Sequence, residues 1–244
     1  SYSPGAEREQ ARKVVALSTA QGRRTLTESR SKELLQAYGI PVTREILARS
    51  AAEAAAAAGS LGYPVVLKIE SPDIAHKTEA GGVLLNLTDA AAVQEGYGSI
   101  MKRAREYNPS ASIDGVLVQE MLSPGLEVIL GVKKDPLFGP TILFGLGGIF
   151  VELLKDLSVR TAPLREEDAR AMLEEIEGKA LLGGVRGEQP RDREALVGIM
   201  MKLSRLAVEL EDEIAELDIN PLIVYADGEG AVAADALVIL TDEA

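Results

Sequence analysis

Apolar residues recur along the chain with two periods, which divides it into amphipathic helices and short strands. Helical periodicity with capping residues predicts helices at about residues 6–20, 28–38, 51–58, 89–107, 166–176 and 191–210. Apolar runs bounded by Pro, Gly or Asn predict strands at about residues 43–47, 64–67, 83–87, 116–119, 127–132, 141–144, 151–154, 215–224 and 232–240. Helices segregated from antiparallel strands predict an α+β fold in two lobes, with antiparallel sheets and flanking helices.

Composition narrows the class of protein. The formal net charge of −12 argues against non-specific binding of nucleic acid. The chain has no cysteine, which excludes disulfides and thiolate chemistry and suits a cytoplasmic protein. No apolar run approaches the ~20 residues of a membrane helix, and the N-terminus lacks a signal-peptide pattern, so we expect no membrane association.

The stretch from Lys68 to Val83 joins two predicted strands through a polar loop that is longer than a hairpin needs. A lysine at the end of an apolar strand is, by itself, most often an edge residue whose ammonium reaches water. The loop after it adds hydroxyls at Ser71 and Thr78 and a glycine pair, Gly81-Gly82, whose backbone N–H groups phosphate oxygens can approach. The combination predicts a phosphate-binding loop, and it also carries Lys77 and the only histidine, His76.

A second candidate site follows the strand at 116–119. The backbone at Gln119, Glu120 and Met121 leaves the strand, where its N–H and C=O groups could pair with the edge of an adenine. The carboxylate of Glu127, a few residues later, could accept the ribose hydroxyls of the same nucleotide. An edge strand with solvated carboxylates is the competing interpretation.

The glycine-rich stretch Gly145-Leu146-Gly147-Gly148 superficially matches a dinucleotide-binding motif. No βαβ unit follows it, so that interpretation is rejected. Two interpretations remain open. The turn could bring Glu152, Asp156 and Arg160 towards a phosphate site, or it could be a plain tight hairpin.

Carboxylates near the C-terminus form the fourth candidate site. Strand alternation places Glu216, Asp218 and Asn220 on one face of the predicted strand 215–224, and Asp235 lies on its partner strand. Asp and Asn are poor strand formers, so three polar oxygen-bearing side chains there indicate more than a solvated face. Oxygen ligands on paired strands suit a Mg²⁺ that also binds phosphate oxygens.

These segments resemble a known family. Residues 31–41, 65–68, 71–83, 118–121, 145–148 and 216–222 match, in order, the nucleotide-binding β subunit of ADP-forming acyl-CoA (acetyl-CoA) synthetases, which are relatives of succinyl-CoA synthetase. The histidine-bearing segment is specific to the acetyl-CoA branch. The resemblance implies an ATP-grasp fold over residues 27–244 after an N-terminal helix (1–26), with a smaller lobe at about 44–118 and a larger lobe formed by 27–43 and 119–244.

The resemblance also implies roles for the residues. Lys68, Lys77 and the loop with Thr78, Gly81 and Gly82 would bind the phosphates of ATP or ADP, Gln119 to Met121 the adenine, and Glu127 the ribose. Asn220 and Asp235 would hold Mg²⁺, and Asp218 would act on the phosphoryl group in transfer. His76 would be a phosphohistidine that relays phosphate from a first one on an α subunit.

The resemblance further implies that a separate α chain, in an α₂β₂ heterotetramer, supplies the CoA-binding and first phosphohistidine domains that this chain lacks. Two alternatives stay open. A regulatory nucleotide-sensing module would bind nucleotide without turnover, and an ATP-grasp carboxylate–amine ligase would need no histidine relay.

Overall fold

The computed structural model describes residues 5–74, 76–148, 156–184, 187 and 189–242. It divides into two compact units, one formed by Ser1–Val42 with Pro124–Ala244 and the other by Thr43–Ser123. The units are therefore described one at a time. No helix within the described ranges combines the length and the apolar character needed to cross a membrane.

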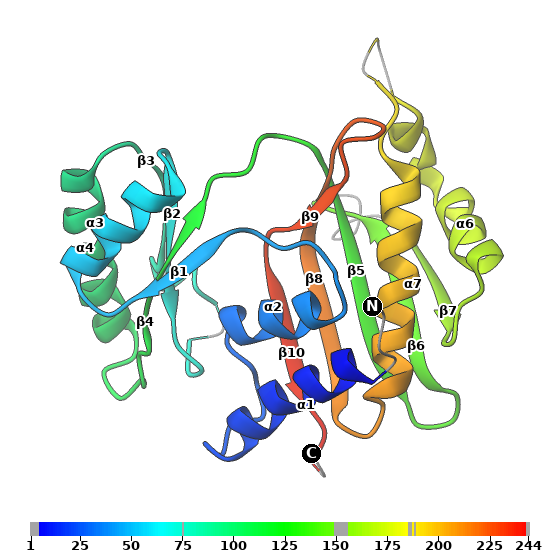
Figure 1. The fold of residues 1–244 in the computed structure, drawn as a ribbon, viewed down its shortest axis with the longest axis horizontal. Helices are drawn as coiled ribbons and strands as arrows, with labels where there is room; N and C mark the ends of the chain where they lie inside the picture. Colours follow the sequence, from blue (N-terminus) through cyan, green and yellow to red (C-terminus); the bar gives the residue numbers. More distant parts are fainter. Residues whose placement is uncertain (1–4, 75, 149–155, 185–186, 188, 243–244) are drawn as a thin grey trace. The chain divides into compact units, whose positions relative to one another are not determined.

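The smaller unit is a four-stranded antiparallel sheet with two helices on one face (Figure 1). Its elements are β1 (Glu45–Ala48), α3 (Ala51–Leu61), β2 (Val65–Glu70), β3 (Val83–Leu87), α4 (Ala90–Tyr107) and β4 (Gly115–Glu120), and the strand order is β1-β4-β2-β3. Alternate residues of β2 and β4 pack with α3 and α4 in one core, among them Val65, Leu67 and Val118. The intervening residues, including Lys68 and Gln119, therefore belong to the opposite face.

The larger unit is a six-stranded sheet in the order β10-β8-β5-β6-β7, with β9 paired to β8. Its strands are β5 (Leu126–Asp135), β6 (Gly139–Leu146), β7 (Leu157–Thr161), β8 (Ile214–Val224), β9 (Ala231–Ala233) and β10 (Ala236–Leu240). Its helices are α1 (Ala6–Thr19), α2 (Glu28–Ala37), α6 (Glu166–Glu175), the 3₁₀ helix η1 (Glu177–Gly183) and α7 (Arg193–Glu209). Helices α2, α6 and α7 pack against one face of this sheet (Figure 1). The other face is thus the one that can carry exposed functional side chains.

The prediction of an α+β fold with antiparallel sheets and flanking helices is confirmed. The helix predicted to stop at Gly59 is wrong in its end: α3 continues to Leu61 and is capped by Gly62. The cap has a φ of 92°, which glycine adopts without strain, whereas Gly59 occupies an ordinary helical position. The prediction ended the helix at the first glycine in the sequence, which placed its end three residues too early.

The other differences concern the C-terminal half. The single strand predicted at 232–240 is two strands, β9 and β10, interrupted at Ala234 and Asp235. The strand β7 and the 3₁₀ helix η1 were not predicted. The strand predicted at 151–154 lies outside the described residues.

The division into units differs in detail from the division predicted from the sequence. The smaller unit extends to Ser123, so that it includes Gln119, Glu120 and Met121, which the prediction assigned to the larger lobe. Helix α1 is in the same compact unit as the large sheet, where it packs on α2.

Candidate functional site

The loop after β2 is anchored at its beginning by side chain–backbone hydrogen bonds. The buried Ser71 hydroxyl donates to the Ser112 carbonyl at 2.6 Å and accepts from the Asp73 N–H at 3.1 Å. The Asp73 carboxylate accepts from the Ser112 N–H at 2.7 Å. The sequence predicted that the Ser71 hydroxyl could bind a phosphate. In the structure this hydroxyl instead fixes the start of the loop to the chain before β4.

The end of the same loop is a single turn that begins at His76. The Ala80 N–H donates to the His76 carbonyl at 3.1 Å, the Gly81 N–H to Thr78 at 3.0 Å, and the Gly82 N–H to Lys77 at 2.7 Å. With Gly81 at a φ of 63°, this pairing is the Schellman motif that ends many helices. The turn gives the histidine a defined backbone position.

The glycine pair has a structural task in this turn. Both N–H groups are already donated, so they could reach a phosphate only if the turn opened. A Cβ on Gly82 would lie 2.6 Å from Ile69 Cγ2, which shows how closely the loop packs on β2. The phosphate contacts predicted for Gly81 and Gly82 stay predictions. His76 and Thr78 are exposed, and Lys77 is half-buried.

Lys68 and Gln119 are on the same face of the small sheet. Lys68 pairs with Leu117 and Gln119 with Val66 across the β2–β4 ladder, so the two side chains are diagonal neighbours on the face opposite α3 and α4. The structure thus brings together one predicted phosphate ligand and one predicted adenine ligand, 51 positions apart in the sequence, on one small surface.

Gln119 and Glu120, the last two residues of β4, have partners that the sequence did not indicate. The Gln119 amide donates from Nε2 to Glu45 Oε2 at 2.7 Å. The Glu120 carboxylate accepts from the backbone N–H and from Nε of Arg44, both at 2.7 Å. The Glu120 N–H donates to the Arg44 carbonyl at 3.0 Å, so both the carboxylate and the backbone N–H of Glu120 are engaged, and its predicted nucleobase contact stays a prediction. Met121 follows the strand, and its side chain is exposed.

Strand β8 presents three polar side chains on one face, as predicted. Glu216, Asp218 and Asn220 are exposed, while Leu217 and Ile219 between them are buried in the core. Asp218 pairs with Gly131 of β5, which has no side chain, and Glu216 lies 3.4 Å from the ammonium of Lys133. Desolvation raises the pKa of the Asp218 carboxyl, and the negative charge of Glu216 raises it further. A perturbed pKa of this kind is common at functional sites, which agrees with the catalytic role predicted for Asp218.

Asn220 and Asp235 are adjacent although 15 positions separate them. The Asn220 N–H donates to the Asp235 carbonyl at 3.2 Å, and the Ala234 N–H donates to the Pro221 carbonyl at 2.9 Å. On the other side of β8, the register shifts between Val128 and Leu130, so that Asn220 and Pro221 together oppose one residue of β5. Such a bulge redirects side chains and is frequent beside active sites.

The donor atoms of this pair fit a hard cation. A carboxylate and an amide oxygen are ligands that Mg²⁺ accepts while it keeps several waters or phosphate oxygens. Within the described ranges, no three His, Cys, Asp or Glu side chains gather closely enough to hold a metal by themselves. The Mg²⁺ contacts predicted for Asn220 and Asp235 stay predictions.

Glu127 is exposed on β5, and the glycine-rich stretch packs against it. The Gly147 N–H donates to the Glu127 carbonyl at 2.8 Å, and a Cβ on Gly147 would lie 3.0 Å from Glu127 Cβ. Asp156, in contrast, accepts from the backbone N–H groups of Glu177 and Gly178 at the start of η1. Arg160 pairs with Glu175 of α6. Asp156 and Arg160 thus have structural partners, and Glu152 lies outside the described residues.

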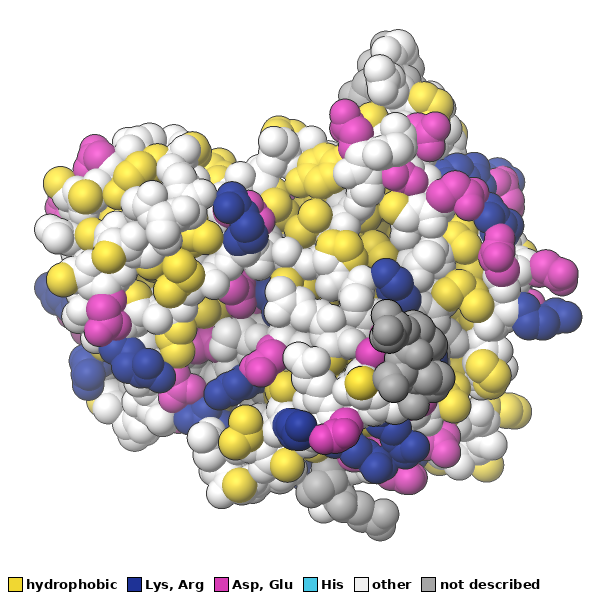
Figure 2. Space-filling model, in the orientation of Figure 1, with side chains coloured by type: hydrophobic (Ala, Val, Ile, Leu, Met, Phe, Trp, Pro, Cys, Tyr) yellow, Lys and Arg dark blue, Asp and Glu magenta, His cyan; other side chains and the backbone are white. Residues whose placement is uncertain are grey.

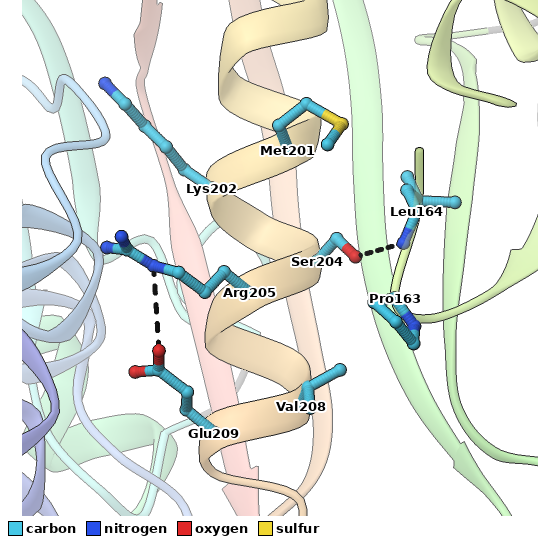
Figure 3. A pocket seen from close by; sticks show the side chains of 8 residues that line it. All are labelled: Pro163, Leu164, Met201, Lys202, Ser204, Arg205, Val208 and Glu209. Atoms are coloured by element: carbon cyan, nitrogen blue, oxygen red, sulfur yellow. Dashed lines mark hydrogen bonds and ion pairs between the residues drawn. The ribbon is translucent and has the colours of Figure 1, made fainter. Parts of the chain in front are cut away.

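A pocket of about 440 Å³ lies along α7 in the larger unit, apart from these predicted residues (Figure 3). It is lined by Pro163, Leu164, Met201, Lys202, Ser204, Arg205, Val208 and Glu209. Its polar groups are engaged: Ser204 accepts from the Leu164 N–H at 2.7 Å, and Lys202 donates to the Gly39 carbonyl at 2.7 Å. Arg205 pairs with Glu209 beside it. The pocket therefore offers an apolar wall but little free charge.

The surface charge is mixed. On the face shown in Figure 2, Lys and Arg side chains are interspersed with Asp and Glu side chains. The many ion pairs on the surface of the larger unit, such as Arg170 with Glu166 and Glu194, agree with this distribution. Attraction of an anionic ligand would thus depend on local groups such as Lys68 and Lys77, because the net charge is −12.

Comparisons with known proteins extend over nearly the whole chain. A family model described as an ATP-grasp domain matches residues 18–240. The chain is 48% identical over 231 residues to the beta subunit of the ADP-forming acetate–CoA ligase II of Pyrococcus furiosus, covering 95% of this chain and 98% of that subunit.

Solved structures give the same correspondence. The chain is similar to a crystal structure from Pyrococcus horikoshii, with a TM-score of 0.93 and 46% identity over 96% of this chain and 99% of that one. It is also similar to a chain of acetyl-coenzyme A synthetase 1 from Candidatus Korarchaeum cryptofilum, solved with coenzyme A and Ca-AMPCP. The TM-score is 0.91 and the identity 44%, over 95% of this chain and 100% of that one.

Proposed function

The chain belongs to the ATP-grasp domain family and to the beta subunits of ADP-forming acetate–CoA ligases within it, and we propose that it is the nucleotide-binding subunit of an ADP-forming acyl-CoA synthetase. The ATP-grasp fold and the family predicted from the sequence segments are confirmed. The reaction is acyl-CoA + ADP + phosphate = carboxylate + ATP + CoA. In it, this chain would perform the exchange of a phosphoryl group between a histidine and the nucleotide.

The observation that carries the proposal is the position of the single histidine. His76 is exposed at the start of a turn that the chain's own backbone closes, next to Lys77 and Thr78. A neutral imidazole can attack a phosphoryl group, and the N–P bond that it forms is labile enough to pass the group on. An exposed and well-positioned imidazole is what a relay between two proteins requires.

The relay would have two transfers. The first breaks the N–P bond of a phosphohistidine on the partner and forms an N–P bond to His76. In the second, the terminal oxygen of the ADP β-phosphate attacks that phosphorus, the N–P bond breaks, and ATP leaves with His76 neutral again. In the related Korarchaeum enzyme a phosphohistidine segment has been seen phosphorylated, and in another structure, solved with coenzyme A and Mg-AMPPCP, it points towards the nucleotide-binding site. These structures support a moving histidine segment in the present chain.

The residues of each unit would contribute charge and position, which are the main protein contributions to phosphoryl transfer. Lys68 and Lys77 would neutralise phosphate oxygens, and Gln119 and Met121 would contact the nucleobase. Asn220 and Asp235 would hold a Mg²⁺ ion, which when bound would neutralise charge on the phosphate oxygens. Asp218, with its raised pKa, would act on the phosphoryl group in transfer.

The proposal includes a partner and a location. Relatives named beta subunits imply a second kind of subunit, and we infer an α chain that carries the CoA-binding and first phosphohistidine domains, in an α₂β₂ complex. We place the reaction in the cytoplasm, since a chain without cysteine gains nothing from an oxidising compartment.

The experiment reconstitutes the reaction. The chain is mixed with an α subunit of this family, acetyl-CoA, phosphate and Mg-ADP, and both ATP and acid-labile phosphate on His76 are measured. We expect ATP formation that needs both chains, and a phosphorylated His76 peptide when ADP is omitted. ATP formed without any phosphate on His76 would contradict the relay. Nucleotide binding without any ATP formation would favour a regulatory nucleotide-sensing module.

A further inference from the structure

Glu45 and Gln119 form an interaction that the mechanism above does not use. They are directly opposite each other in the β1–β4 ladder, and Gln119 Nε2 donates to Glu45 Oε2 at 2.7 Å. The Thr43 hydroxyl donates to the same carboxylate oxygen at 3.3 Å. Gln119 is only 2% exposed, so its amide is held in a nearly water-free position.

The chemistry of the pair determines which way the amide points. An ionised carboxylate only accepts hydrogen bonds, so the amide nitrogen of Gln119, not its oxygen, must face Glu45. The bond is charge-assisted and therefore stronger than a bond between neutral groups. The amide oxygen Oε1 is directed away from Glu45 as a consequence. Among the described residues, no other side chain or backbone group is a hydrogen-bond partner of this amide.

The surroundings indicate what this oxygen could meet. Gln119 is on the sheet face that carries Lys68, the predicted phosphate ligand, and immediately precedes Glu120 and Met121, the other predicted adenine contacts. An amide oxygen only accepts hydrogen bonds, so it favours a hydrogen-bond donor and opposes another acceptor. An adenine offers an N6 amine, a donor, at the position where a guanine offers O6, an acceptor.

We propose that Glu45 is a positioning residue that fixes the Gln119 amide with its oxygen available to the nucleobase, so that the site selects adenine over guanine nucleotides. This inference rests on the proposed function, because it takes Gln119 as a nucleobase contact. The selection comes from orientation: the same amide turned around would present its NH₂ group and would suit guanine O6. Sequence reasoning missed Glu45, since 74 positions separate it from Gln119.

The test measures the affinities for Mg-ADP and Mg-GDP by calorimetry with the full chain. For the natural chain we expect ADP to bind at least roughly tenfold more tightly than GDP, the discrimination typical of a site that pairs with a specific polar group. Glu45→Gln keeps the shape but supplies both an acceptor and a donor, so the Gln119 amide can turn around. We expect the ratio of the two dissociation constants to fall about tenfold, mainly because GDP binds more tightly.

Two further variants complete the experiment. Glu106→Gln removes a carboxylate of the same unit from the exposed surface of α4 and should leave the ratio unchanged. Gln119→Met removes the amide, and should weaken ADP binding while GDP binding stays the same or improves. This variant tests the inference independently if Glu45→Gln does not fold.

The outcomes separate the inference from the proposed function. An unchanged ratio in folded Glu45→Gln, an equal affinity of the natural chain for both nucleotides, or a fall of the ratio in Glu106→Gln would each overturn the positioning role while the nucleotide site stands. If the natural chain binds neither nucleotide, the proposed function fails together with the inference.

Discussion

The candidate site residues of the two units are held by differently built scaffolds. In the larger unit, Asp218 and Asn220 are on a central strand, hydrogen-bonded to β5 on one side and β10 on the other. Their exposed side chains alternate with buried leucine and isoleucine. In the smaller unit, His76 is on a loop that is anchored through Ser71 at one end and through its own backbone turn at the other.

The two scaffolds differ in how far a functional side chain can be changed without loss of the fold. On β8 the backbone ladder and the buried neighbours hold the strand, so an exposed carboxylate can change without loss of the scaffold. In the loop, residues that could contact phosphate, such as Gly81 and Gly82, also close the turn. Substitutions in the loop should therefore mix loss of structure with loss of function, except at its exposed side chains.

The largest expected effect is at the exposed residue of the loop scaffold. His76→Ala should lower ATP formation by at least ~10³-fold, since the nucleophile of the relay is lost. The free energy of unfolding should change by less than ~0.5 kcal/mol, because the side chain is exposed. The measurements are ATP formation in the reconstituted complex and urea unfolding of the chain.

Glu79→Ala is the matched control for this variant, since Glu79 is an exposed neighbour in the same turn. It should keep nearly full activity. Full turnover of His76→Ala would end the relay hypothesis. A large loss of stability in His76→Ala would show that the His76 side chain also stabilises the fold.

The next largest effect is at Asp235 in the larger unit, which lies beside β8 in the interruption between β9 and β10. Asp235→Ala should weaken the binding of Mg-ADP by about 10- to 100-fold, the range seen when a metal site loses a supporting group. Binding of ADP without Mg²⁺ should change little, because the carboxylate would act through the ion. The fold should lose only ~1 kcal/mol, from the hydrogen bond that Asp235 accepts from the Ala236 N–H.

Calorimetry with and without Mg²⁺ measures both quantities. Glu229→Ala changes an exposed carboxylate of the nearby turn between β8 and β9 and should leave both affinities as they are. If Asp235→Ala weakens ADP equally in the presence and absence of Mg²⁺, Asp235 is not a metal ligand.

The two scaffolds also differ in how far the sequence predicts them. The faces of β8 follow from the alternation of Glu216, Leu217 and Asp218, because a strand has a side-chain period of two. The pairing of Asn220 with Asp235 was predicted as well, since the two strands are joined by a short turn rich in glycine. Here local patterns carry the information.

In the smaller unit the local sequence pattern carries less information about the site. The roles of Ser71 and Gly82 depend on Ser112 and Ile69, and the orientation of Gln119 depends on Glu45, all contacts between segments that are separate in sequence. A polar residue in a loop has the same appearance in the sequence whether it binds a ligand or its own backbone. The sequence therefore predicted the position of the loop, but not which of its residues are free to bind a ligand and which hold the loop's own structure.

A smaller effect concerns the closure of the loop. Gly82→Ala should destabilise the chain by ~1–3 kcal/mol, the cost of overpacking, since the new Cβ would lie 2.6 Å from Ile69 Cγ2 and 3.1 Å from the Lys77 carbonyl. Gly98→Ala, within α4, is the control: nothing lies within 4 Å of its Cβ, and alanine should stabilise the helix by ~0.5–1 kcal/mol. Urea unfolding measures both, and equal stabilities would mean that the turn does not depend on its second glycine.

The smallest effect tests the charge on the strand scaffold. Glu216→Gln removes a negative charge that helps to raise the pKa of Asp218, so that pKa should move down towards its ordinary value while the contribution of desolvation remains. A carboxyl whose pKa is raised on folding binds its proton more tightly in the folded chain. The stability that this proton provides is present at low pH and is lost as the pH rises through the window above the ordinary value of about 3.9.

Glu216→Gln should therefore gain up to ~0.5 kcal/mol over the natural chain at pH 7, a small figure because water screens an exposed pair, and nothing at pH 3. Urea unfolding at both pH values, together with an NMR titration of the Asp218 carboxyl carbon, measures the two effects. A gain that persists at pH 3 would mean that the substitution acts through packing and not through Asp218. A loss at pH 7 would mean that the ion pair of Glu216 with Lys133 outweighs the repulsion from Asp218.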